Sequence, residues 1–262
     1  MGNYTFAQWL LFFYIYCFCG WCIESAIVTV TERRPTNRGF LRGPLLPLYG
    51  FGAIAILLVS LPVRTYPPLV FLCGMAATTA LEYFTGWLME TLFKTKYWDY
   101  SGKKCSLHGR IWLVSSLFWG VLSLVLTYLL HAPVERLVLS IDRGGLIVTD
   151  TAVSIFVLFD TYYAVRAAVD FRRLLESAAR LRAEIGELRE QLTQQWEDNE
   201  RLTALRERME HAKASYSAQV HHLTMVSRRF FRVNPTARSK RFDDMLNELK
   251  SRLAERRKPH DD

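Results

Sequence analysis

The chain has 262 residues, half of them hydrophobic, and a formal net charge of +8 at pH 7. Its mean hydropathy of +0.06 is ordinary for a soluble protein, but the mean hides two different halves. Residues 1–165 carry 12 Lys/Arg and 9 Asp/Glu, whereas residues 166–262 carry 21 and 16. This change of composition excludes a single soluble domain and indicates a membrane domain followed by a soluble tail. The sequence holds no G-x-x-x-x-G-K-[ST] phosphate loop, which excludes ATP hydrolysis by that route.

The first apolar run starts at Phe6 and lacks the charged start of a signal peptide, so we interpret it as a spanning helix. A spanning helix needs about 20 mostly apolar residues. The second candidate segment is the weakest, because Pro44 and Pro47 stand at its entry. We therefore predict an all-α fold, a polytopic membrane helix bundle of about five spanning helices in residues 1–165. The segments are 6–30, 44–61, 68–93, 109–131 and 145–165.

The charge of the loops predicts the orientation of this bundle. The first loop (31–43) holds four arginines and the third (93–110) holds five Lys/Arg, whereas the second (61–68) has one Arg. The fourth loop (131–145) has two Arg balanced by two acids. The positive-inside rule then places loops one and three in the cytoplasm. We expect a multi-pass protein of the plasma membrane, with its N-terminus outside and its C-terminal tail in the cytoplasm.

Two similar stretches, GWCIES at 20–25 and GWLMET at 86–91, each place a glutamate in an apolar helix. Glu24 is followed 19 residues later by Gly43, and Glu90 by Gly109, and a returning helix is predicted after each glycine. The pattern predicts a parallel repeat of two helices. Convergence of short apolar motifs is the alternative.

Carboxylates in spanning helices are costly, so they face the bundle interior, pair with cations or line a polar path. One interpretation pairs Glu24 and Glu90 with loop arginines that pin the loops under the bundle. The other makes them line a cytoplasmic-side pocket for a cation, a proton or a polar substrate. Glu82 lies deeper than Glu90 on the same helix face and is the better candidate for a path. The candidates for a polar path or gate are Glu24, Glu82, Glu90 and Asp160.

The loops and the returning helices supply the other candidates. Aromatic residues at a membrane interface usually anchor helices, glycines permit tight turns, and Asp99 would cap a turn or bind a cation. The five cysteines lie outside the tail, and we expect them to behave as small hydrophobes, with no metal site and no cofactor. The loop candidates are Arg38, Gly39, Arg42, Gly43, Tyr49, Trp98, Asp99, Tyr100, Gly109 and Arg110.

The tail begins with a heptad pattern from Leu174 to Leu223, which predicts a coiled-coil helix over residues 166–225. We predict a homodimer through residues 174–223, while an intramolecular hairpin or packing on another protein remains open. Residues 226–262 combine a basic segment with a short amphipathic helix. We expect the basic residues to contact lipid or protein rather than nucleic acid. They are Arg228, Arg229, Arg232, Lys240 and Arg241.

Several motifs together carry a resemblance to a known family. NRGFLRGPLLPLYG, EYFTGWLMETLF, WDYS and SLHGRIWLVSSLFWG, over roughly residues 6–125, resemble the putative ABC-transporter type IV (CmpB-like) family of bacterial membrane proteins. The fifth helix and the tail resemble longer members of that family. Ser106 departs from the pattern, which has Asn there. The resemblance implies an integral membrane protein of transport type.

We therefore expect a transporter or permease-type component that lacks its own ATPase and uses a separate ATPase subunit. The alternative is a non-transporting membrane scaffold or sensor that dimerises through its coil. A lipid-modifying enzyme with a glutamate and His108 as acid–base groups is a third hypothesis, but we expect no enzyme, because the sequence shows no nucleophile near His108.

Overall fold

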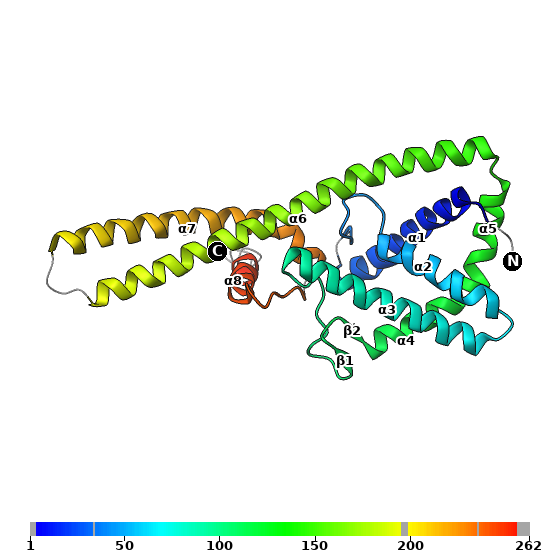
Figure 1. Cartoon of the computed structure of the whole chain (residues 1–262), viewed down its shortest axis with the longest axis horizontal. Helices are drawn as coiled ribbons and strands as arrows, with labels where there is room; N and C mark the ends of the chain where they lie inside the picture. The colour runs from blue at the N-terminus through cyan, green and yellow to red at the C-terminus, as the bar shows by residue number, and fades with distance from the viewer. Residues whose placement is uncertain (1–3, 34, 195–198, 235, 256–262) are drawn as a thin grey trace. The chain divides into compact units, whose positions relative to one another are not determined.

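The computed structural model describes residues 4–33, 35–194, 199–234 and 236–255. Regular structure in these residues is helical apart from two strands of two residues each, which confirms the all-α class (Figure 1). The chain divides into two compact units. One comprises residues 1–92 and 97–165, and the other residues 93–96 and 166–262.

The first unit begins with α1 (Phe6–Glu32), whose start is fixed by a capping box between Thr5 and Gln8. α2 (Pro47–Ser60) follows, begins with a proline in its first turn, and ends in the 3₁₀ turn η1 (Leu61–Val63). The two helices share a core in which Phe12 of α1 meets Leu57 of α2, both fully buried.

The second helix pair has a similar layout. α3 (Pro67–Phe93) has 27 residues, as α1 has. α4 (Leu113–Val125) starts four residues after Gly109, and α2 starts four residues after Gly43. The second loop differs from the first because it contains a short antiparallel hairpin of β1 (Ser106–Leu107) and β2 (Ile111–Trp112).

The predicted fourth loop is largely helical, which corrects the sequence interpretation. After α4 come a π-helical turn, η2 (Leu126–Leu130), and α5 (His131–Ser140). Pro133 occupies the first turn of α5, where a missing N–H is tolerated. Figure 1 shows the chain turning between α4 and α5.

Within the residues that the structure describes, four helical stretches are long and apolar enough to span a membrane by length and composition, one fewer than predicted. They are Phe6–Thr31, Pro67–Phe93, Leu113–Ser140 and Arg143–Thr193. The predicted segment 44–61 instead forms the shorter helix Pro47–Val63. Because the helix starts only at Pro47, its 17 residues extend about 25 Å, less than the roughly 30 Å hydrocarbon core.

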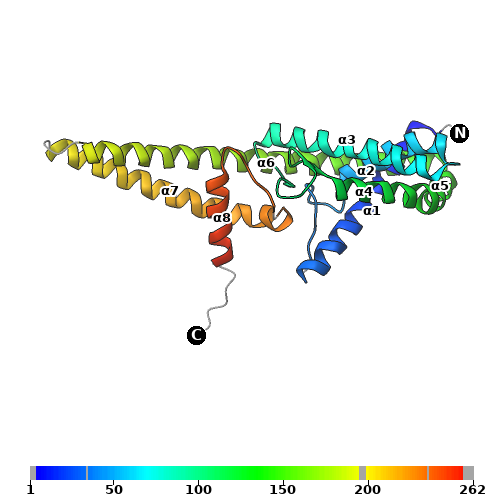
Figure 2. The same ribbon diagram turned by 90° about the horizontal axis from the view of Figure 1, so that it is seen from below.

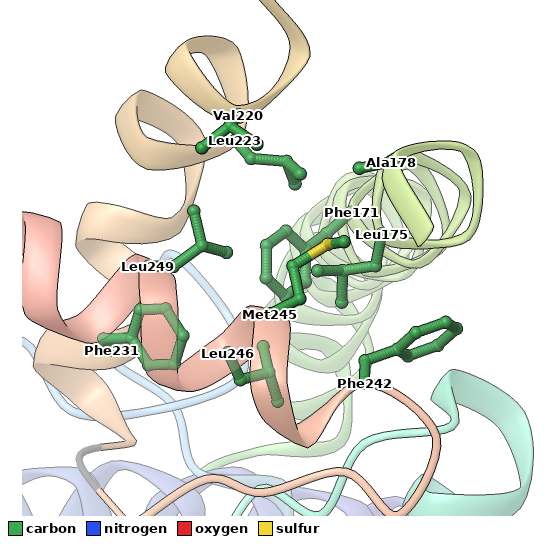
Figure 3. Close-up of a cluster of buried hydrophobic side chains, with 10 residues drawn as sticks. All are labelled: Phe171, Leu175, Ala178, Val220, Leu223, Phe231, Phe242, Met245, Leu246 and Leu249. Carbon is green, nitrogen blue, oxygen red and sulfur yellow. The ribbon is translucent and has the colours of Figure 1, made fainter. Parts of the chain in front are cut away.

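α6 (Arg143–Gln194) is one unbroken helix in both views (Figures 1 and 2). In the second unit its tail part packs against α7 (Asn199–Val233) and α8 (Asp243–Glu255). Figure 3 shows the fully buried side chains of Leu175, Leu223 and Leu246, one from each helix, meeting in a shared core. Part of the apolar seam of the predicted coil, at Ala178, Val220 and Leu223, is therefore buried within one chain, as in the hairpin alternative to the predicted homodimer.

The second unit also includes residues 93–96, which are the last residue of α3 and the three residues that follow it. The main chains of Lys96 and Arg238 form an antiparallel bridge, with N···O distances of 2.7 and 3.2 Å. The hydroxyl of Ser239 donates to the carbonyl of Lys94 over 2.6 Å. The segment before α8 is thus hydrogen-bonded to the residues after α3.

Candidate functional site

Glu24 lies about two turns before the end of α1 and has one neutral and one charged partner. The hydroxyl of Tyr49 donates to one carboxylate oxygen over 2.8 Å, and Nε of Arg38 lies 3.2 Å from the other. Gly20, one turn earlier on the same face, makes room for this contact. A Cβ at Gly20 would lie 2.2 Å from the Cβ of Tyr49. In GWCIES the absence of a side chain at Gly20 therefore lets Tyr49 pack close to α1, where its hydroxyl binds Glu24.

Glu82 on α3 is only 5% exposed and is held by neutral donors from α4. The hydroxyl of Ser115 lies 3.1 Å from both carboxylate oxygens, and the indole N–H of Trp119 donates over 3.1 Å. Two neutral donors from α4 thus bind one buried carboxylate, and Tyr100, in the loop before β1, lies near its charge.

Glu24 and Glu82 belong to one cluster. The rings of Tyr49 and Trp119, which bind the two carboxylates, have centroids 5.1 Å apart. Burial raises the pKa of Tyr100, and the negative charge of Glu82 raises it further. Tyr100 therefore remains a hydrogen-bond donor at neutral pH. The repeat motif and the deeper acid, which the sequence treats as separate features, meet through two aromatic side chains.

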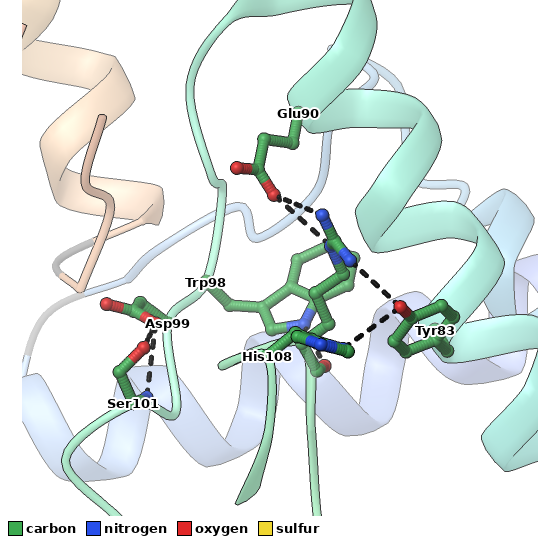
Figure 4. Close-up of polar contacts among 7 residues, drawn as sticks. Tyr83, Glu90, Trp98, Asp99, Ser101 and His108 are labelled. Carbon is green, nitrogen blue, oxygen red and sulfur yellow. Dashed lines mark hydrogen bonds and ion pairs between the residues drawn. The ribbon is translucent and has the colours of Figure 1, made fainter. Parts of the chain in front are cut away.

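Glu90 forms the second ion pair of the unit (Figure 4). One carboxylate oxygen accepts from Nε and Nη2 of Arg110 at 3.2 and 2.9 Å. The guanidinium lies over the ring of Tyr83 at 5.2 Å and donates to its hydroxyl. His108 Nδ1 is 3.1 Å from that same hydroxyl. Arg110 thus ties the end of α3 to the hairpin, and both repeat glutamates contact a loop arginine.

The hairpin depends on its turn. His108 and Gly109 have φ of 54° and 70°, and the N–H of Arg110 donates to the carbonyl of Leu107. Two successive positive φ values explain why a glycine follows the histidine. The indole of Trp98 donates to the carbonyl of Arg110 over 2.8 Å, so the WDYS segment fixes the main chain of the arginine that binds Glu90.

Asp160 on α6 binds main-chain amides of the first loop. Its carboxylate accepts from the N–H of Arg42 at 3.1 Å and of Gly43 at 2.8 Å. A Cβ at Gly43 would lie 2.7 Å from the ring of Phe156 and 3.1 Å from Asp160. The hydrogen bonds described for Asp160 thus come from two main-chain amides. Gly43 is required here for close approach to α6.

The remaining candidates have simpler surroundings. Asp99 caps a turn, accepting from the N–H and hydroxyl of Ser101 at 3.1 and 2.6 Å. Gly39 packs near Leu46, whose Cδ1 would be 3.1 Å from an added Cβ. The five basic tail candidates are exposed and lie apart from this cluster in sequence: Arg228, Arg229 and Arg232 on α7, and Lys240 and Arg241 before α8.

Sequence reasoning missed Ser115, Trp119 and Tyr83, which bind the predicted residues. Apolar helices contain many serines and aromatics, so only their position about one turn apart on α4 could have indicated the first two. It also missed the buried side chain of His131 on α5, which contacts two tyrosines. Nδ1 lies 2.9 Å from the hydroxyl of Tyr16 and Nε2 3.3 Å from that of Tyr4. His131 was assigned to a loop, which hid its burial.

A cavity of about 30 Å³ lies between α1, α2 and α4, beside Tyr16, Tyr49 and Trp119. This volume is sufficient for a buried water molecule. Among the described residues, no three His, Cys, Asp or Glu side chains are grouped so that they could hold a metal ion.

A family model described as putative ABC-transporter type IV matches residues 11–165. No curated protein and no solved structure matches the chain. The matched region is more than half of the 262 residues and includes all four acidic candidates, from Glu24 to Asp160. The resemblance inferred from the loop motifs is thereby confirmed, and it extends through the apolar part of α6. The chain belongs to the putative ABC-transporter type IV family.

Proposed function

We propose that the chain is a permease-type component of a membrane transport system, with Glu82 at its polar centre. The observation that carries this proposal is the contrast between Glu82 and the two repeat glutamates. Glu24 and Glu90 each contact an arginine, whereas the hydrogen bonds described for Glu82 come from neutral groups. A carboxylate without a cation on an apolar helix is costly to keep, which favours a functional role.

Glu24, Glu90 and Asp160 have supporting roles in this proposal. Each binds a loop that follows or precedes a helix, through Arg38, Arg110 or the amides of Arg42 and Gly43. They brace the ends of the bundle around Glu82, and the first of them shares the Tyr49–Trp119 contact with it.

The loop charges support an orientation with loops one and three in the cytoplasm, the N-terminus outside and the tail inside. The absence of a phosphate loop from the sequence means that a separate ATPase subunit would drive transport. We propose no catalytic role for His108, whose ring nitrogen lies against Tyr83 beside Arg110.

The test is purification of the full chain from its native membrane in mild detergent, with identification of the subunits that accompany it. We expect an ATPase with a phosphate loop and ATP turnover in liposomes. Glu82→Gln should keep this subunit but reduce turnover at least about tenfold, because the charge is lost while the shape is kept. Glu82→Asp should retain part of the activity.

Glu90→Gln is the matched control, since it removes one carboxylate from the same helix and should affect stability more than turnover. A preparation without any ATPase subunit, or a Glu82→Gln complex with wild-type turnover, would contradict the proposal.

A second candidate function is a membrane scaffold or sensor, favoured by the separate core of the tail unit and its bridge to the residues after α3. A homodimer would then use surfaces outside the buried seam of the hairpin. Deleting residues 171–262 should lower the oligomeric mass in detergent by more than the deleted mass. A mass that falls only by the deleted residues argues against this function.

A further inference from the structure

Arginines gather where α6 enters the tail and where α7 ends. Residues 221–232 contain Arg228, Arg229 and Arg232 and no acid, and all three arginines are exposed. Residues 166–173 contain three arginines against one aspartate. Two of these arginines form ion pairs within α6: Arg166 with Asp170 at 4.0 Å and Arg172 with Glu176 at 3.7 Å. The first pair is more than half exposed, so it binds its arginine weakly.

The two groups of arginines lie near each other on the hairpin of α6 and α7. The rings of Phe171 on α6 and Phe230 on α7 have centroids 5.0 Å apart, and Gln219 bonds to Ser177. The contacts run in opposite directions along the two helices, so the hairpin is antiparallel. The end of α7 therefore returns beside the first tail residues of α6.

The arginines of residues 166–173 follow the apolar segment of α6 directly in the sequence. Val165 ends the apolar part of the helix, and Arg166, Arg172 and Arg173 come within the next eight residues. Basic residues that follow a spanning segment so closely are attracted to anionic headgroups of the adjacent leaflet.

Two apolar side chains accompany the arginines on α7. Met225 and Val226 are 57% and 43% exposed, one turn before Arg228 and Arg229. Exposed apolar residues next to arginines are typical of helices that contact the boundary between headgroups and acyl chains.

We propose that the six arginines of residues 166–173 and 221–232 form a binding surface for anionic phospholipid headgroups of the adjacent leaflet. Guanidinium groups bind phosphate with paired, charge-assisted hydrogen bonds. The other end of α7 lacks an excess of positive charge, because residues 200–210 hold three arginines interleaved with three glutamates. This surface is independent of the Glu82 cluster and of any transport activity.

The test uses the full chain in nanodiscs of equal parts phosphatidylglycerol and phosphatidylcholine. Native mass spectrometry of the released protein measures the ratio of the two lipids that remain bound. The variant R228Q/R229Q/R232Q should lower the enrichment of phosphatidylglycerol about tenfold, because each basic residue near the surface contributes to binding. R228K/R229K/R232K should keep most of the enrichment.

R201Q/R206Q/R208Q is the matched control, with the same change of charge at the other end of α7, and should leave the enrichment unchanged. An equal loss in this control, or no enrichment in the wild type, overturns the proposal. The proposal is also overturned if R228Q/R229Q/R232Q leaves the enrichment of phosphatidylglycerol unchanged but loses binding to a labelled RNA oligonucleotide. If R228Q/R229Q/R232Q does not fold, the single Arg→Gln variants are measured instead. The proposal is overturned if no single variant lowers the enrichment.

Discussion

Gly20 is the residue on which the contact between Tyr49 and Glu24 depends. A Cβ at this position would overlap the Cβ and Cγ of Tyr49 at 2.2 and 2.3 Å. We expect Gly20→Ala to destabilise the chain by about 1–3 kcal/mol, because α1 and α2 must move apart. Thermal unfolding in detergent measures this. Gly102→Ala is the control, since nothing lies within 4 Å of its added Cβ. An unchanged midpoint for Gly20→Ala would show that the helices adjust without cost.

Tyr216 makes the tail sensitive to high pH. Burial, with help from its hydrogen bond to Glu248, raises the pKa of Tyr216 to about 12. A folded-state pKa above the unfolded value of about 10 stabilises the fold fully below pH 10, and this stabilisation is lost as the pH rises to 12.

The measurement compares urea unfolding of wild type and Tyr216→Phe between pH 9 and 11.5. The wild type should lose more stability over this range than the variant, because the variant has no hydroxyl to ionise. Equal losses in both proteins would show that other groups cause the pH dependence.

At the scale of elements, α8 holds the tail unit together. Leu246 is fully buried in the core shared by α6, α7 and α8. We expect Leu246→Ala to destabilise the unit by about 2–5 kcal/mol, because a cavity remains where the side chain was. Limited proteolysis of the full chain should then cleave residues 236–255 faster. Asn247→Ala, on the exposed side of the same helix, is the control and should resemble wild type.

Helix length and apolar composition predicted α1 and α3 closely, whereas α4 starts four residues later than predicted, after β2. They failed for α5, because Glu135 and Arg136 interrupt the apolar composition that marks a spanning segment. They overestimated α2, whose prolines delay its start. The heptad seam of the tail is compatible with a partner chain or with the same chain, and the pattern alone cannot distinguish the two.

The candidate site was predictable in its acids and not in its contacts. Apolar surroundings single out Glu24 and Glu82 without stating that Tyr49 and Trp119 connect them. Contacts of this kind depend on how α1, α2, α3 and α4 cross, and those crossings depend on small residues such as Gly20.

At the scale of the whole molecule, the predicted orientation has a direct test at Cys105, an exposed thiol in the third loop. If that loop is cytoplasmic, a membrane-impermeant maleimide should label this thiol only after the cells are permeabilised. The difference between wild type and Cys105→Ser reports this thiol, because the other cysteines are common to both. Labelling of Cys105 in intact cells would reverse the proposed orientation.

The bridge between Lys96 and Arg238 can form only late in the synthesis of the chain. The neighbouring hydrogen bond joins Lys94 and Ser239, which are 145 residues apart. At a synthesis rate of about 5–20 residues per second, roughly 7–30 s separate the appearance of these two partners on the ribosome. α3 and α4 must therefore enter the membrane before the segment that follows α3 finds its partner. The segment before α8 therefore completes a contact with residues that are synthesised much earlier, directly after α3.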